Sequence, residues 1–134
     1  MNKRVVSLWF PRLSSERVLR TRPIDAPFAL THLNANTQRV YCLNTQAEKQ
    51  GLRKGMSFSD ARVLCPDLQT SVANPQADER FVRTLARWAG KYCPWVGVDG
   101  DGLTLDVTGS AHLFGGEAAM LDDIHARLDR AGLS

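Results

Sequence analysis

The stretch Trp95-Val-Gly-Val-Asp-Gly-Asp-Gly-Leu-Thr-Leu-Asp-Val107 decides the fold of this chain. It holds two short apolar segments around Asp99-Gly-Asp-Gly, and an Asp-Gly turn between apolar strands is a strong signal for a β-hairpin. Residues 76–92, just before it, place apolar side chains at intervals of three and four, as on one face of a helix. A second such pattern begins at Gly116-Glu117 and ends near Gly132. The C-terminal half therefore predicts helix, hairpin and helix in that order.

The first strand of the same domain is predicted at the start of the chain. Residues 4–10, Arg-Val-Val-Ser-Leu-Trp-Phe, are nearly all apolar, which is typical of a strand buried on both faces, and Pro11 ends it. Together with the C-terminal half this gives the order β-α-β-β-α, a split βαβ (ferredoxin-like) pattern without its final strand. We predict an α+β fold and expect an N-terminal fragment of a longer protein, with an open edge where the last strand is missing.

Residues 13–73 are predicted to form a small α/β subdomain inserted into this domain. A short helix precedes Pro23, and residues 28–33 and 39–43 read as a hairpin over an asparagine-rich turn. Two further short helices end at Gly51 and Cys65, and a short strand follows. The larger domain would then consist of residues 1–12 and 74–134.

Composition limits the class of protein. The chain has 134 residues, 43% hydrophobic and 23% charged, as in ordinary soluble globular proteins. No apolar run approaches the ~20 residues of a membrane span, so no membrane partner is expected. Three cysteines without a C-x-x-C pair favour reduced, buried thiols over disulfides or a zinc site. His32, His112 and His125 have no metal-ligand spacing. We expect a cytoplasmic protein.

The net charge of +3 is unevenly distributed. Residues 1–71 carry 11 Lys/Arg against 5 Asp/Glu, whereas the remainder carries 6 against 9. A basic first half is compatible with a phosphate backbone as partner, and also with arginines that only solvate helix faces. The helix predicted over 76–92 has a basic stripe, which we interpret as a solvated outer face: Arg80, Arg83, Arg87 and Lys91.

Several sequence blocks resemble the Y-family (translesion) DNA polymerases. Leu105-Asp-Val-Thr-Gly-Ser110, between the hairpin and a helix, is similar to the palm motif of that family. Gly51-Leu-Arg-Lys-Gly-Met-Ser-Phe-Ser-Asp-Ala-Arg-Val-Leu-Cys-Pro-Asp-Leu68 is similar to its fingers segment. Within that family the chain resembles the branch named ImuB most specifically. Three blocks carry this resemblance: Ser7-Leu-Trp-Phe-Pro-Arg-Leu13, Tyr92-Cys-Pro-Trp95 and Thr108-Gly-Ser-Ala-His-Leu-Phe-Gly-Gly116. The resemblance covers nearly the whole chain and implies a partial palm, residues 1–12 and 74–134, with fingers at 13–73.

The resemblance implies that metal-binding carboxylates have been lost. Nucleotidyl transfer by two metal ions needs carboxylates that hold the ions about 3.5–4 Å apart. Active members of the family place an aspartate where this chain has Leu8, with a further acidic position at Phe10. Their hairpin aspartate and glutamate match Asp101 and Gly102. Asp101 is the only remaining ligand of three, so we expect neither a catalytic group nor a bound metal, and Asp101 suits a turn residue.

The triphosphate positions differ as well. The family pattern has a tyrosine and, three residues later, an arginine, which fall at Thr45 and Glu48; a glutamate there repels polyphosphate. The aromatic residue that excludes ribose falls near Arg12 or Leu13. No nucleotide-binding residue and no cofactor are expected, and Mg²⁺ would be needed only by an active polymerase. The weak candidates for DNA contact are Arg12, Arg53, Lys54 and Arg62.

The resemblance implies a catalytically degenerate homologue that acts as an adaptor in DNA-damage-induced (SOS) mutagenic translesion synthesis and repair. Such a protein would be bacterial, cytoplasmic and nucleoid-associated during damage. The implied partners are the sliding clamp, the RecA-like accessory protein ImuA and an error-prone replicative-type polymerase, mostly through regions after Ser134. DNA binding by these residues alone should be weak.

Two alternatives stay open. The first is an active or residually active Y-family polymerase, in which Asp99 replaces a lost ligand on the turn that also holds Asp101. The second is a nucleic-acid-binding ferredoxin-like domain without polymerase ancestry.

Overall fold

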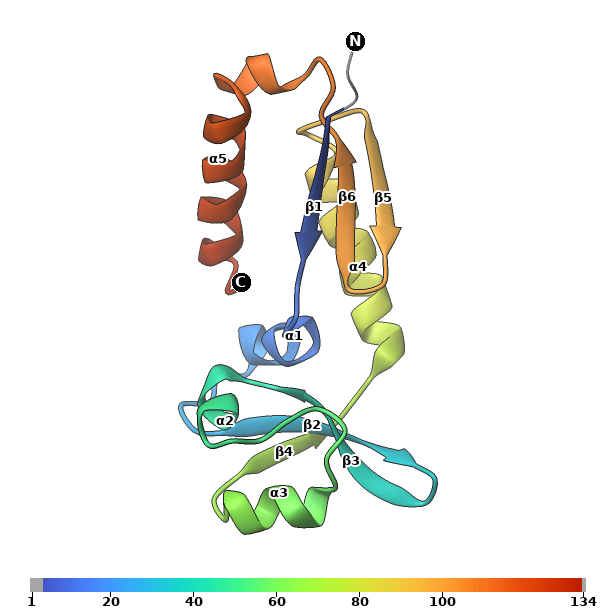
Figure 1. Cartoon of the computed structure of the whole chain (residues 1–134), viewed down its shortest axis with the longest axis vertical. Coiled ribbons are helices and arrows are strands. Elements are labelled where there is room, and N and C mark those ends of the chain that lie inside the picture. Colours follow the sequence, from blue (N-terminus) through green and yellow to red (C-terminus); the bar gives the residue numbers. More distant parts are fainter. Residues whose placement is uncertain (1–3, 134) are drawn as a thin grey trace. The chain divides into compact units, whose positions relative to one another are not determined.

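The computed structural model describes residues 4–133, which form two compact units (Figure 1). Unit 1 consists of Met1–Pro11 and Gln76–Ser134, and unit 2 is Arg12–Pro75. Each unit has a three-stranded sheet of its own. The predicted α+β fold is confirmed.

The sheet of unit 1 has the order β1-β6-β5. Strand β1 (Val5–Trp9) pairs antiparallel with β6 (Gly102–Asp106), which pairs antiparallel with β5 (Trp95–Asp99). The central position of the last strand in sequence, between the other two, is the arrangement of a split βαβ unit. Among the described residues no further strand joins this sheet, so the outer edge of β1 has no strand beside it there.

Helices cover one face of this sheet and leave the other open. Figure 1 shows α4 (Pro75–Ala89) behind the sheet, and none of the described segments lies in front of it. In β1 exposure alternates: Val5, Ser7 and Trp9 are exposed, whereas Val6 and Leu8 are half-buried. The prediction that this strand is buried on both faces is therefore wrong. A nearly continuous apolar run is typical of a strand covered on both faces, but in β1 only the face that bears Val6 and Leu8 packs against helices.

The two long helices of unit 1 are tied together by Tyr92, which follows α4. The predicted apolar face of α4 is buried at Val82, Leu85 and Ala89. The Tyr92 hydroxyl donates a hydrogen bond of 2.5 Å to Asp123 Oδ2 in α5 (Glu117–Arg130). Burial, together with this carboxylate, raises the pKa of Tyr92 to about 12. A short 3₁₀ helix, Ala111–Phe114, precedes α5.

The sheet of unit 2 has the order β3-β2-β4. Strand β2 (Phe28–Asn34) pairs antiparallel with β3 (Thr37–Leu43) and parallel with β4 (Gln69–Val72). Ala35 and Asn36 both have positive φ, 53° and 62°, as a two-residue type I′ hairpin turn requires. The helices of unit 2 are α1 (Leu13–Thr21), α2 (Thr45–Lys49) and α3 (Phe58–Leu64).

Asn44 connects three segments of unit 2 at the start of α2. Its side-chain oxygen accepts hydrogen bonds from the backbone N–H groups of Phe28, at 3.0 Å, and Ala47, at 2.9 Å. Its side-chain amide donates to the carbonyl oxygen of Ala26 at 2.8 Å. The side chain therefore caps the helix and also joins it to the start of β2.

The cysteines are buried and free, as the sequence predicts: Cys42, Cys65 and Cys93. Burial is the main cause that raises the pKa of the Cys65 and Cys93 thiols. Of the helices in the described part of the chain, none has the length and apolar character needed to cross a bilayer.

Candidate functional site

The strand register of unit 1 determines which side chains share the uncovered face of the sheet. Side chains alternate between faces along a strand, and directly paired residues point to the same side. Trp9 pairs with Gly102, and Gly102 with Asp99, at one end of the sheet. At the other end Val5 pairs with Asp106, and Asp106 with Trp95. We call this surface the open sheet face; its residues are Val5, Ser7, Trp9, Trp95, Gly97, Asp99, Gly102, Thr104 and Asp106.

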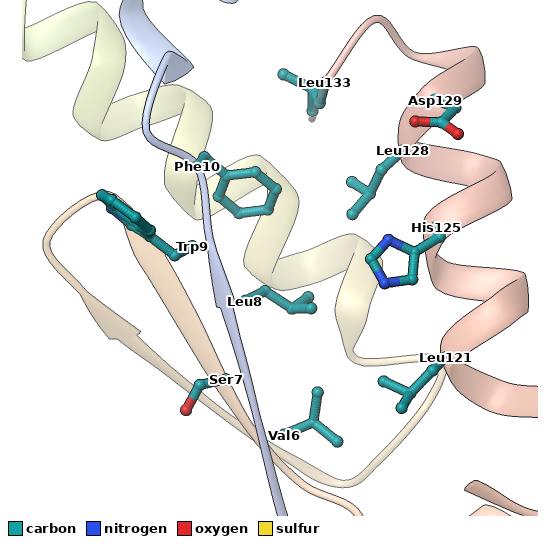
Figure 2. Close-up of a pocket in the computed structure, with 10 residues that line it drawn as sticks. All are labelled: Val6, Ser7, Leu8, Trp9, Phe10, Leu121, His125, Leu128, Asp129 and Leu133. Atoms are coloured by element: carbon teal, nitrogen blue, oxygen red, sulfur yellow. The ribbon is translucent and has the colours of Figure 1, made fainter. Parts of the chain in front are cut away.

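The first two predicted carboxylate positions do not lie on this face. Leu8 pairs with Leu103 and points toward α5, as Figure 2 shows. Phe10 is fully buried, and its backbone N–H donates to the carbonyl oxygen of Asp101 at 3.1 Å. The register places Ser7, rather than Leu8, on the same face as Gly102. A hydroxyl and an indole, from Ser7 and Trp9, therefore occupy the part of β1 that borders the hairpin.

The backbone around Gly102 leaves no room for a side chain. A Cβ atom built on this glycine would lie 2.6 Å from the main-chain oxygen of Leu8. Real Cβ atoms do not approach a backbone oxygen so closely, so any larger residue requires β1 to shift. The position where the family has its glutamate is thus closed by the strand beside it.

The acids near the hairpin do not form a metal cluster. Asp99 and Asp101 are exposed at the turn. Asp106 accepts a hydrogen bond from the backbone N–H of Thr108 at 3.0 Å through Oδ1. Within residues 4–133, no group of three His, Cys, Asp or Glu side chains is arranged to hold a metal ion.

The predicted triphosphate positions lie in unit 2, where an ion pair joins two of the residues singled out. Thr45 is the first residue of α2, and Glu48 lies in the same helix. Arg12 Nη1 is 3.6 Å from Glu48 Oε2, and Arg12 Nε is 3.7 Å from Glu16 Oε1. The Arg12 side chain is 22% exposed. Its guanidinium is therefore engaged by two carboxylates of its own unit, which oppose the binding of an anion there.

The four candidate DNA contacts lie on separate elements of unit 2. Arg12 precedes α1, Arg53 and Lys54 lie in the exposed turn after α2, and Arg62 is in α3. The Arg62 guanidinium stacks on the Phe58 ring, 5.0 Å from its centroid, and donates to the carbonyl oxygen of Pro66 at 3.2 Å. Arg12 and Arg62 thus each contact partners within unit 2.

Two features of this region were missed in the sequence. The single polar residue of β1, Ser7, was the signal that this strand has an open face, because a serine amid apolar residues suits the solvent side of a sheet. The ion pair of Arg12 with Glu48 joins residues 36 positions apart in sequence and had no local signal.

Comparison with known proteins identifies the family. The profile of the impB/mucB/samB family matches residues 13–132. Protein ImuB of Caulobacter vibrioides, in strains NA1000 / CB15N and CB 15, is 48% identical over 84 residues, which are 62% of this chain and 18% of that protein.

The fold is shared with solved polymerases. Dbh DNA polymerase in a post-insertion binary complex has a TM-score of 0.81 at 17% identity, and DinB from Sulfolobus solfataricus has 0.82 at 18%. Each match covers 97% of this chain and 40% of the polymerase chain, so the chain spans less than half of either. The arrangement of two small sheets with their helices is that of a Y-family palm and fingers. The chain therefore belongs to the impB/mucB/samB family of Y-family DNA polymerases.

Proposed function

We propose that this chain is part of a DNA-damage-response protein that uses a polymerase fold as an adaptor in translesion synthesis and performs no nucleotidyl transfer itself. The observation that carries this proposal is the open sheet face. Where a two-metal mechanism needs three carboxylates, β1 presents Ser7 and Trp9, and the hairpin presents Asp101 and Gly102. Of the three positions at which the resemblance places metal-binding carboxylates, only Asp101 keeps an acid, and one such carboxylate with substrate phosphates does not hold two magnesium ions.

The charge arrangement in unit 2 supports the same proposal. Polymerases of this family bind the triphosphate through a tyrosine and an arginine, at positions that match Thr45 and Glu48. Here Glu48 is itself ion-paired with Arg12, and a further carboxylate, Glu16, lies on the other side of the guanidinium. A triphosphate would have to displace this internal pairing and approach two carboxylates.

The likeness to ImuB of Caulobacter vibrioides supplies the proposed pathway. We infer a bacterial, cytoplasmic protein, recruited to the nucleoid during DNA damage. Its partners would be the sliding clamp, the RecA-like protein ImuA and an error-prone replicative-type polymerase that carries out the synthesis. These contacts are proposed for regions after Ser134, and DNA contact within this chain for the exposed turn at Arg53 and Lys54.

Primer extension by the full-length protein tests the proposal. We expect no incorporation with magnesium or manganese, and the same result for Asp101→Ala, while DNA binding by the full-length protein is retained. The control is an active Y-family polymerase on the same primer and template. Incorporation that disappears in Asp101→Ala would overturn the proposal. It would favour the active-polymerase alternative, which rests on the presence of Asp99 and Asp101 on one turn.

A further inference from the structure

The open sheet face presents two tryptophans to solvent. Trp9 is 74% exposed and Trp95 is 54% exposed, and Val5 of the same face is exposed too. They lie on one continuous surface, because Val5 and Trp95 both pair with Asp106, and Trp9 pairs with Gly102 four residue pairs further along, on the same face. Large apolar side chains grouped on an exposed surface mark interaction sites in soluble proteins.

Small residues between the tryptophans keep the face flat. Thr104 is flanked by Ser7 on one side and Gly97 on the other in the central row of pairs. Trp95 lies over Gly97: its Cη2 atom is 3.0 Å from the position that a Cβ of that glycine would take. With Gly102 beside Trp9, neither indole has a bulky neighbour on the adjoining strand. A partner side chain can therefore reach both aromatic rings.

The charge of this surface is negative. Asp99 and Asp101 are exposed at the end of the sheet where Trp9 lies, and Asp106 belongs to the end with Trp95. Residues 5–11 and 92–110, which contain all three strands, include no lysine, arginine or histidine. Arg4, which precedes β1, is held by Glu117, with Nη2 2.6 Å from Oε2.

We propose that the open sheet face is a docking surface for a segment of a partner protein in which arginine or lysine alternates with apolar residues. Guanidinium and ammonium groups bind tryptophan faces through cation–π contact, and the aspartates supply matching charge. Exposed bases of single-stranded nucleic acid also stack on aromatic platforms, but the phosphates of such a ligand would meet Asp99, Asp101 and Asp106, and none of residues 5–11 and 92–110 is basic. The chemistry of the face therefore favours a basic protein segment over nucleic acid.

The inference deepens the proposed adaptor function and rests on it, because an active polymerase would need the same face for metal ions and triphosphate. Primer extension reports on the adaptor function separately. Activity that depends on Asp101 would overturn that function, whereas the peptide experiment below reports on docking alone.

Peptide binding to the full-length protein tests the docking surface. The probes are a fluorescein-labelled ten-residue peptide of alternating arginine and leucine, its glutamate–leucine counterpart, and a ten-nucleotide oligo-dT, each measured by fluorescence anisotropy. We expect binding of the arginine–leucine peptide only. Trp9→Ser or Trp95→Ser should weaken it at least about tenfold, since buried tryptophans dominate interface energetics. The double variant Asp99→Asn/Asp101→Asn should weaken it several-fold.

Matched variants elsewhere in unit 1 are the controls. Leu113 is 72% exposed in the 3₁₀ helix, and Asp122 is exposed on α5. Leu113→Ser and Asp122→Asn should leave the affinity unchanged. The proposal is overturned if neither peptide binds, if both bind equally, or if the tryptophan variants bind as tightly as the unaltered protein. Oligo-dT binding that is lost in Trp9→Ser would instead show that the face stacks bases.

Discussion

The main-chain oxygen of Leu8 lies close to the position that a side chain at Gly102 would occupy. Gly102→Ala should lower the free energy of unfolding by about 1–3 kcal/mol, because the Leu8 oxygen, 2.6 Å from the new Cβ, has to move with its strand. Denaturant unfolding measures the change. The matched control is Gly97→Ala on the same face, where the new Cβ would meet only the ring of the exposed Trp95, which can rotate away. Equal losses in the two variants would contradict the close approach at Gly102.

At the scale of single residues, the hairpin has clear sequence signals, whereas the face of β1 that is exposed has few. Asp101 and Gly102 lie in a recognisable block and could be assigned by their place before the palm motif. Ser7 is the one polar residue within β1, and the strand register places Ser7 on the open sheet face and Leu8 on the opposite face. In a strand, a shift of one residue moves every side chain to the other face.

Among the elements, helix α2 depends on one side chain. Asn44→Ala should lower the free energy of unfolding of unit 2 by about 2–3 kcal/mol, because it removes the cap and also leaves a buried N–H group of Phe28 without its acceptor. Ser57→Ala is the control, since Ser57 caps α3 through one hydrogen bond, to the Asp60 N–H at 3.1 Å, and should cost about 1 kcal/mol. Circular dichroism with denaturant compares them. A smaller loss in Asn44→Ala than in Ser57→Ala would contradict the connecting role.

The Tyr92–Asp123 contact between the end of α4 and α5 makes the stability of unit 1 depend on pH. The hydrogen bond from Tyr92 lowers the pKa of Asp123 in the folded state. Its contribution to the stability of unit 1 is therefore fully present above the unfolded-state pKa of Asp123, about 4, and is lost as the pH falls through the folded-state pKa. The pKa of Tyr92 is raised to about 12 in the folded state. Its contribution to stability is therefore fully present below the unfolded-state pKa, about 10, and is lost as the pH rises through the folded-state pKa.

Tyr92→Phe should therefore be less stable than the unaltered protein by about 1 kcal/mol at neutral pH. The difference should narrow below about pH 4 and above about pH 10. Denaturant unfolding at a series of pH values measures both curves. Curves that stay parallel across the whole range would contradict the linkage of this hydrogen bond to the titration of Asp123 and Tyr92.

On the scale of the whole molecule, the tryptophans report on one unit alone. All three, Trp9, Trp88 and Trp95, belong to unit 1, whereas Leu30 is fully buried in unit 2. Leu30→Ala should destabilise unit 2 by about 2–5 kcal/mol. We expect the circular dichroism transition to split, with its first phase at lower denaturant, while the tryptophan fluorescence midpoint stays in place. A fluorescence midpoint that moves with the first phase would show that the units unfold together.

Most of the fold could be predicted because its signals are local. The helix of residues 75–89, the Asp-Gly hairpin and the Asn-rich turn each follow from neighbouring residues. The exposure of one sheet face is harder to predict, because it depends on where α4 and α5 pack, and within β1 only Ser7 indicates it. The same holds for Arg12, whose pairing with Glu48 is a product of tertiary structure.

Gly102 also restricts how this surface can change over generations. A single codon change can replace this glycine, but any side chain it introduces meets the Leu8 oxygen before it can serve a metal ion. A carboxylate at this position therefore also requires a backbone adjustment in β1. The neighbouring tryptophans face no such barrier. The proposed docking surface can therefore change by single substitutions at Trp9 or Trp95, whereas a side chain at residue 102 also needs β1 to move.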